Sequence, residues 1–101
     1  MHQLPKNRNT VVILGGKGGL EARYRRLLAN HGYELRHFER RVPSRTLPAA
    51  HKIALVIVMI SMVSHPLLAH ARQIAAGGAE LVYLERPSLS AVQRTMAERL
   101  L

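Results

Sequence analysis

Two short stretches hold the residues of this sequence that are best suited to bind a ligand. They consist of a glycine-rich run and of polar residues that follow a long apolar segment: Gly15, Gly16, Lys17, Gly18 and Gly19, then Met62, Ser64 and His65. Glycines let backbone N–H groups approach an anion closely, and Lys17 adds a full positive charge. His65 could bind an anion or a metal, or act as an acid or base. Together the two stretches predict a site for an anionic small molecule or cofactor.

Each stretch also has a purely structural interpretation. The glycines could simply permit a tight turn, and His65 could assist the start of a helix. The glycine run does not match the dinucleotide-binding fingerprint, because Glu21 stands where the third glycine belongs. It also lacks the Ser or Thr that follows Gly-Lys in a P-loop. The sequence therefore leaves the ligand open.

Haem is the most specific cofactor that these residue types suggest. The chain has six His and four Met but no Cys, and haem iron is held by His or by a His/Met pair. His65 is the predicted iron ligand, and Met62 could flank the same pocket while nearby Arg or Lys pairs with the propionates. Methionine in an apolar run is more often core filler, and no His spacing typical of zinc sites occurs.

The residue types argue against most catalytic mechanisms. The chain contains neither Cys nor Asp, and its six Glu are scattered singly. Thiol chemistry, paired carboxylates and a Ser-His-Asp triad are therefore excluded. We expect a non-catalytic binding or sensing domain, although Glu85 could still reach a histidine in space. The absence of cysteine gives no sign of an oxidising compartment, so the expected location is the cytoplasm.

The charge of the chain favours an anionic partner. Lys and Arg number 15 against six acidic residues, which gives a formal net charge of +9. Nucleic acid is therefore the alternative partner, bound by arginines of the basic first half: Arg23, Arg26, Arg40, Arg41 and Arg45. The few aromatic residues occupy core-like positions, which argues against single-strand binding. Residues 53–71 are uncharged but are interrupted by Ser, His and Pro, so we expect no membrane span.

The elements that must position these residues follow from hydrophobic periodicity. Apolar runs at 11–14, 33–38, 53–60 and 80–84 predict strands, and helical spacing predicts helices from Leu20, Pro66 and Leu89, with Ser64 and Ser88 as N-caps. This alternation predicts a three-layer, Rossmann- or flavodoxin-like α/β fold with a four-stranded parallel sheet in the order 2-1-3-4. Its switch point would bring residues 15–19 opposite residues 61–65.

The expected domain organisation is simple. Residues 1–9 are a basic N-terminal arm, and residues 10–101 form a single domain. A chain of 101 residues lies near the lower end of the sizes that bury a comfortable core. Dimerisation would help such a chain, so we expect a homodimer.

The run VVILGGKGGLEARYRRLLANHGYELRHF, followed by ALVIVMISMVSH, resembles the bacterial family DUF2325 over about residues 11–96. The residues that carry the resemblance are four short features: Gly15-Gly16, Tyr24-Arg25, His37 and Ser64-His65. The resemblance implies an α/β fold and a functional Ser-His turn, and it supplies no reaction. This chain departs from the family pattern in three places: Glu39-Arg40-Arg41 replaces a glycine pair, Ala54 or Leu55 an Asp, and Arg72 a Lys.

Overall fold

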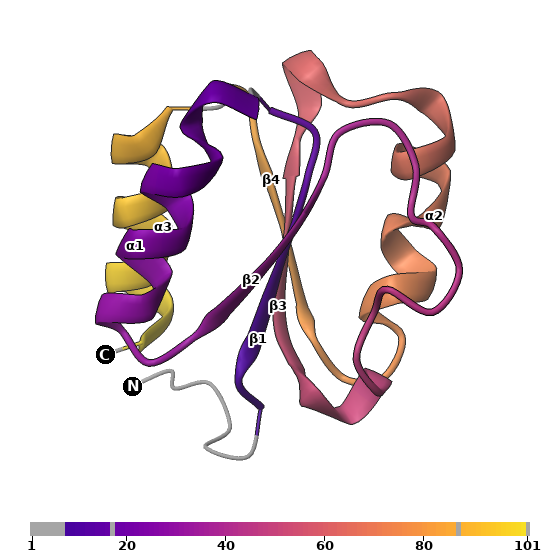
Figure 1. Ribbon diagram of the computed structural model, residues 1–101, viewed down its shortest axis with the longest axis horizontal. Coiled ribbons are helices and arrows are strands. Elements are labelled where there is room, and N and C mark those ends of the chain that lie inside the picture. Colours follow the sequence, from indigo (N-terminus) through magenta and orange to yellow (C-terminus); the bar gives the residue numbers. More distant parts are fainter. Residues whose placement is uncertain (1–7, 17, 87, 101) are drawn as a thin grey trace.

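The computed structural model describes residues 8–16, 18–86 and 88–100. They form four strands, three α-helices and three 3₁₀ turns (Figure 1). In chain order these are β1 (Thr10–Leu14), η1 (Gly18–Leu20), α1 (Glu21–Asn30), β2 (Glu34–Phe38), η2 (Ala50–Lys52), β3 (Ile53–Met59), η3 (Ile60–Met62), α2 (His65–Ala75), β4 (Glu80–Leu84) and α3 (Leu89–Leu100).

The strands form one parallel sheet in the order β2-β1-β3-β4, which confirms the predicted fold class and strand order. Every residue of β1 and β3 is buried. A central strand covered on both faces needs side chains that are apolar throughout, and the run from Ile53 to Met59 supplies them. The strand ends at Met59, because the next three residues turn into η3.

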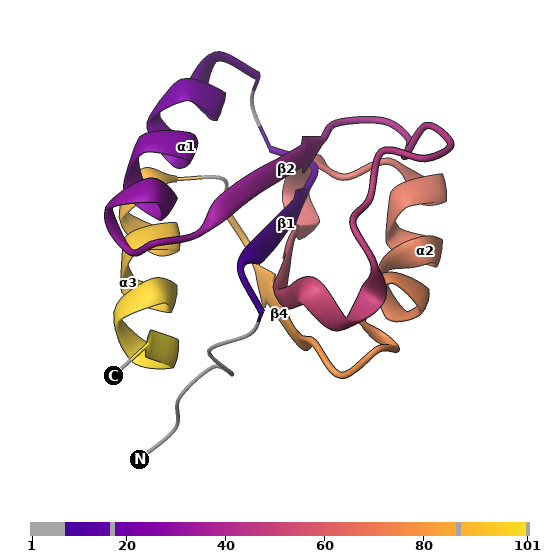
Figure 2. The same ribbon diagram turned by 60° about the horizontal axis from the view of Figure 1, so that its bottom comes forward.

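The helices cover the two faces of the sheet unequally. Helices α1 and α3 lie together on one face, and α2 covers the other (Figures 1 and 2). Tyr24, Leu28 and Met96 belong to the core on the α1/α3 side, whereas Leu67 and Ile74 belong to the core on the α2 side. The three-layer arrangement follows from right-handed crossovers that leave β1 and β3 in opposite directions.

The segment between β2 and β3 joins the α2 side of the molecule. Figure 2 shows it extending from the end of β2 toward α2. Val42 and Leu47 anchor it by packing against the core on that side. The segment ends in the 3₁₀ turn η2, which leads directly into β3.

Arg8 connects three segments at the end of the sheet where the strands begin. Its guanidinium donates hydrogen bonds to the carbonyls of Ala50, Ile53 and Gly77 at 3.3, 2.9 and 2.7 Å. The backbone N–H of Asn9 also donates to the carbonyl of Lys52 at 3.0 Å. Residues 1–7 of the predicted arm lie outside the described residues, whereas Arg8 and Asn9 are bonded to the sheet region.

Candidate functional site

The glycine turn, residues 15–19, follows β1 as predicted. Gly15 and Gly16 both have φ of 86°, a left-handed conformation that favours glycine. The N–H of Gly15 donates to the carbonyl of Phe38 at 2.8 Å, and the N–H of Gly16 donates to that of Met62 at 3.0 Å. These two amides are therefore occupied by neighbouring backbone and are not open to a ligand. Gly18 and Gly19 are exposed, and Lys17 lies outside the described residues.

Close packing explains why the first residue of this turn, Gly15, has no side chain. A Cβ atom added to Gly15 would lie 2.5 Å from the carbonyl oxygen of Met62 and 2.9 Å from the Cα of Val63. The turn after β1 thus contacts the backbone after β3 directly. The two predicted stretches do meet at one edge of the sheet, and Gly15 is what lets them approach.

His37 fixes the glycine turn from the side of β2. Its Nε2 lies 2.6 Å from the carbonyl oxygen of Gly15, and its Nδ1 lies 3.0 Å from Oε1 of Glu21. Its side chain is fully buried. His37 therefore bridges the backbone of the glycine turn and the side chain of Glu21 at the start of α1.

Tyr24 supports this histidine from helix α1. The two rings meet edge to face, with centroids 5.8 Å apart and an interplanar angle of 87°. Tyr24 is fully buried, and burial raises the pKa of its phenol above the ordinary value of 10.0. Burial also raises the pKa of Tyr33, which packs against the same core. His37 thus lies against a buried aromatic ring and is shielded from solvent.

Ser64 is the predicted N-cap of α2 and has that role. Its Oγ accepts a hydrogen bond from the N–H of Leu67 at 3.4 Å. The same hydroxyl donates to the carbonyl of Arg40 at 2.5 Å, which ties the loop after β2 to the start of α2. His65, the first residue of α2, is exposed. The serine is therefore engaged in structure, while the histidine faces solvent.

A cavity of about 630 Å³ lies at the carboxyl ends of the strands. We call it the carboxyl-edge cavity; it is lined by Leu20, Arg23, Met62, Arg86, Ser88, Leu89 and Ser90. These residues come from the start of α1, the end of β3 and the connection from β4 into α3. Of the predicted cofactor-binding residues it contains Met62, and Arg23 comes from the nucleic-acid alternative. His65 is not among the residues that line it.

The polar groups of the carboxyl-edge cavity are mainly donors. Arg23 and Arg86 are exposed, and neither forms an ion pair with a carboxylate in the described part of the chain. The Ser88 hydroxyl caps α3 by accepting the N–H of Ala91 at 3.1 Å. The first turn of a helix carries a partial positive charge, which adds to that of the arginines. The cavity is therefore suited to an anion.

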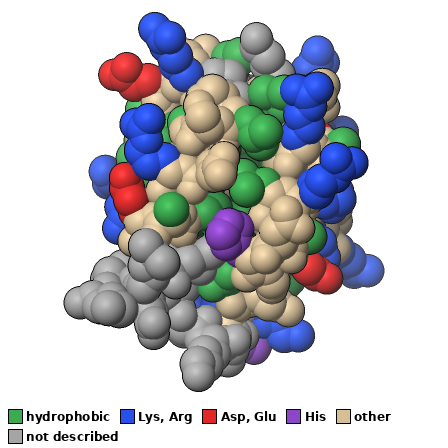
Figure 3. All heavy atoms as spheres, turned by 90° about the vertical axis from the view of Figure 1, so that its left-hand side faces the viewer, with side chains coloured by type: hydrophobic (Ala, Val, Ile, Leu, Met, Phe, Trp, Pro, Cys, Tyr) green, Lys and Arg blue, Asp and Glu red, His purple; other side chains and the backbone are tan. Residues whose placement is uncertain are grey.

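A smaller groove, lined by residues of α1 and by Leu89 at the start of α3, adjoins this cavity. It has a volume of about 370 Å³ and shares Arg23 and Leu89 with the carboxyl-edge cavity. Figure 3 shows hydrophobic side chains gathered along the middle of this face, with Lys and Arg side chains on both margins. Apolar surface and positive charge thus run side by side along the helices.

The five arginines of the nucleic-acid alternative lie in two separate groups. Arg23 and Arg26 line the groove on the α1/α3 face. Arg40, Arg41 and Arg45 belong to the loop after β2, which packs on the α2 side of the sheet (Figure 1). The fold does not unite them into one basic surface, so nucleic-acid binding stays a prediction from charge.

Sequence reasoning missed most of the carboxyl-edge cavity. Arg86 and Ser90 were not singled out, and Ser88 was identified only as a helix cap. The available signal was the polar connection after the fourth strand, which in a parallel sheet ends at the same edge as the other strands. Among the described residues, no group of three or more His, Cys, Asp or Glu is placed to hold a metal ion.

Comparison with models of known protein families shows which family this chain belongs to. The sequence model of DUF2325, described as an uncharacterized protein conserved in bacteria, matches residues 10–99. The chain belongs to the DUF2325 family. No curated protein and no solved structure gives a match. In the described part of this DUF2325 protein, no helix has the length and apolar character needed to cross a membrane.

Proposed function

We propose that this DUF2325 protein binds an anionic small molecule with an apolar or aromatic ring in its carboxyl-edge cavity. One observation carries the proposal: Arg23 and Arg86 reach the same cavity from different elements, beside an apolar wall that includes Met62. The arginines would neutralise the charged groups of the ligand, and the wall would contact its ring. A volume of about 630 Å³ is within the range typical of small-molecule sites.

A binding or sensing role is favoured over catalysis. None of the described residues that line the carboxyl-edge cavity is a Glu or a His. Ser88 and Ser90 line the cavity, but a serine hydroxyl becomes a nucleophile only beside a general base, and His, Glu and Asp are the usual bases. The cavity instead offers arginines and hydroxyls, which hold a ligand in place.

Haem is the specific ligand that we propose to test. It combines an apolar macrocycle with two carboxylates, which suits the mixture of apolar walls and arginines. Met62 lines the cavity and could approach the iron. His65 begins α2, so its predicted role as iron ligand needs its own variant.

The proposal is tested by titrating the full chain with two probes, ADP by calorimetry and haem by absorption. We expect at least one probe to bind. Replacing Arg23 or Arg86 by Ala should weaken binding about 10- to 100-fold, since a hydrogen bond to a charged group contributes about 1.5–3 kcal/mol. Arg94→Ala is the matched control, because Arg94 is exposed on α3 and is not among the residues that line the cavity.

The outcomes distinguish three parts of the proposal: the role of His65, the location of the site and the class of ligand. A haem Soret band that is lost in His65→Ala would assign His65 as a ligand, and one that persists would remove it. Equal affinity of wild type and the Arg23→Ala/Arg86→Ala double variant would show that the ligand binds elsewhere. If neither probe binds, the proposed class of ligand is wrong.

We propose in addition that the protein forms a homodimer through strand β4. This strand lies at one edge of the sheet, and no other described strand pairs with its outer side. The residues from Leu81 to Leu84 are uncharged, whereas β2 at the other edge carries Glu34 and Arg36. Charged side chains protect an edge strand from pairing, and an apolar edge invites it.

Exposed apolar side chains on and near β4 are a second argument for this dimer interface. Ile60, Met62, Leu68 and Tyr83 are exposed by 40–46 %. Tyr83 lies in β4, Ile60 and Met62 lie in η3 after β3, and Leu68 lies in α2. An antiparallel pair centred on Val82 would place Tyr83 of one copy opposite Leu81 of the other. Aromatic and aliphatic side chains form favourable cross-strand pairs, so the strand is complementary to itself.

A further inference from the structure

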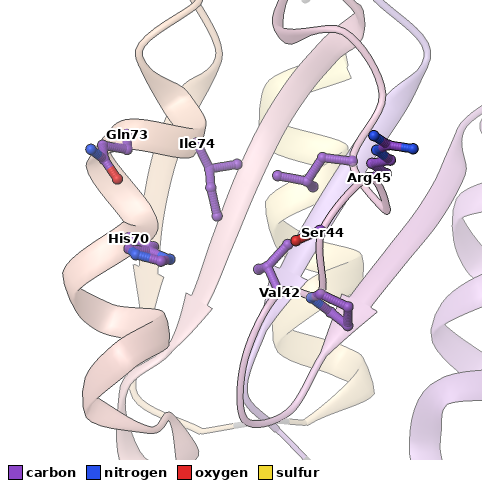
Figure 4. Close-up of a pocket in the computed structure, with 8 residues that line it drawn as sticks. Val42, Ser44, Arg45, His70, Gln73 and Ile74 are labelled. Atoms are coloured by element: carbon purple, nitrogen blue, oxygen red, sulfur yellow. The ribbon is translucent and has the colours of Figure 1, made fainter.

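A second cavity lies on the other face of the sheet, between α2 and the loop after β2. We call it the loop cavity; it has a volume of about 380 Å³. Figure 4 shows Val42 and Ser44 on the loop facing His70 and Ile74 on the helix across an open space. Arg45 lies farther along the loop at the margin of this space, with its guanidinium directed away from the helix. This cavity shares no lining residue with the carboxyl-edge cavity.

The floor of the loop cavity is aliphatic. Val42, Leu47 and Ile74 line it, and all three also belong to the core cluster on the α2 side. Such side chains are held in place by the packing beneath them. A hydrocarbon group resting on this floor would remove apolar surface from water without any rearrangement of the core.

The rim of the loop cavity carries hydrogen-bond donors. Arg45 supplies a guanidinium, Ser44 a hydroxyl, Gln73 an amide and His70 an imidazole. No Glu is among the described residues that line the cavity. Donors on the rim of an aliphatic floor suit a molecule with a hydrocarbon body and a negatively charged end, which the long Arg45 side chain would reach by a change of rotamer.

Arg45 adds an independent argument from its backbone. It has φ of 64° and is the one non-glycine residue in the described part of the chain with a positive φ. Glycine or asparagine would adopt this conformation at lower cost. Residues held in such sparsely populated conformations are enriched at ligand sites, so the backbone marks Arg45 as a candidate ligand contact.

We propose that the loop cavity binds an aliphatic carboxylate. The hydrocarbon chain would lie on Val42, Leu47 and Ile74, and the carboxylate would accept hydrogen bonds from Arg45 and a second donor of the rim. Arginine is the residue whose planar fork best matches a carboxylate. This site does not depend on the ligand proposed for the carboxyl-edge cavity, because the two cavities share no lining residue.

The test is a titration of the ¹⁵N-labelled full chain with sodium hexanoate, followed residue by residue in NMR spectra. We expect saturable shifts at residues 42–47 and 70–74, and smaller changes with acetate or 1-hexanol, which each lack one part of the ligand. Shifts that map to Arg23, Met62 and Ser88 would instead place the carboxylate in the carboxyl-edge cavity and overturn the proposal.

Arg45→Gly is the decisive variant. It removes the guanidinium and also suits the positive φ, so its melting temperature should equal or exceed that of wild type. Its affinity for hexanoate should fall at least about tenfold. Arg41→Ala is the control, because it removes the same charge from an exposed position of the loop that does not line the cavity. Equal affinity of Arg45→Gly and wild type would refute the site.

Discussion

His37 joins the three segments that surround the glycine turn. One ring nitrogen contacts the carbonyl of Gly15 and the other contacts Glu21, so β1, α1 and β2 are connected through one buried side chain. Neither nitrogen is left for a metal or a ligand. The resemblance to the family drew attention to this histidine, and its contacts explain it as a positioning residue for the turn.

Alkaline pH should reveal the buried tyrosine beside this histidine. Burial raises the pKa of Tyr24 above 10.0, its ordinary value and its value in the unfolded chain. Between the two pKa values the folded state holds a proton that the unfolded state has lost. The free energy of unfolding should therefore be unaffected below pH 10 and fall as pH rises above it, by up to about 1.4 kcal/mol per pH unit for this group.

The measurement is urea denaturation of wild type and Tyr24→Phe between neutral pH and pH 11. The variant lacks the ionisable phenol, so its stability should decline less steeply above pH 10. A smaller decline should persist, because Tyr33 also has a pKa that burial raises. Parallel profiles for the two proteins would show that the Tyr24 phenol does not contribute.

At the scale of elements, Gly15 determines how closely the turn after β1 approaches the end of β3. Gly15→Ala should be strongly destabilising, because the added Cβ would lie 2.5 Å from the Met62 carbonyl oxygen and φ is 86°. Gly32→Ala is a matched control. Its φ is 82°, and an added Cβ would meet no atom within 4 Å.

The pair of variants separates steric conflict from backbone strain. Both should lose stability from the left-handed φ, and Gly15→Ala should lose a further 1–3 kcal/mol or so from overpacking. Thermal and urea denaturation would measure the difference. Equal losses would mean that the two turns can move apart without cost, and that their contact does not hold the edge of the sheet together.

Much of the arrangement of elements could be predicted from the sequence. The run from Ile53 to Met59 is apolar throughout, as a central parallel strand requires, and Ser64 precedes Pro66 as a helix N-cap does. The residue at which a strand ends is harder to predict from the sequence. The shift from β3 into η3 follows from contacts of Met62 with the glycine turn, which lie far apart in sequence.

The lining of the candidate site could be predicted only in part. Topology alone brings residues 15–19 and 61–65 to one edge, and that juxtaposition was foreseen. Which side chains face the resulting space depends on the angles of α1 and α3, and so Arg23 and Arg86 meet there while His65 does not. Periodicity identifies the buried side of a helix, but it does not identify the neighbours of an exposed arginine.

At the scale of the whole molecule, a dimer through β4 should depend on the apolar edge. Light scattering coupled to size-exclusion chromatography should give the mass of two chains for wild type. Tyr83→Lys should give the mass of one chain, because a two-fold pair brings the added charge close to the apolar residues of the other copy. Tyr83 is 44 % exposed, so the substitution should leave the fold of each chain intact.

Ala22→Lys provides the control for this experiment. It adds the same charge at an exposed position of α1, on the other face of the sheet from Tyr83, and should remain dimeric. A monomeric wild type, or a Tyr83→Lys variant that stays dimeric, would rule out pairing through β4. Tyr83 lines neither the carboxyl-edge cavity nor the loop cavity, so Tyr83→Lys changes no residue of either proposed ligand site. Ligand binding can therefore be measured in this variant as well as in wild type, which tests whether assembly and binding are coupled.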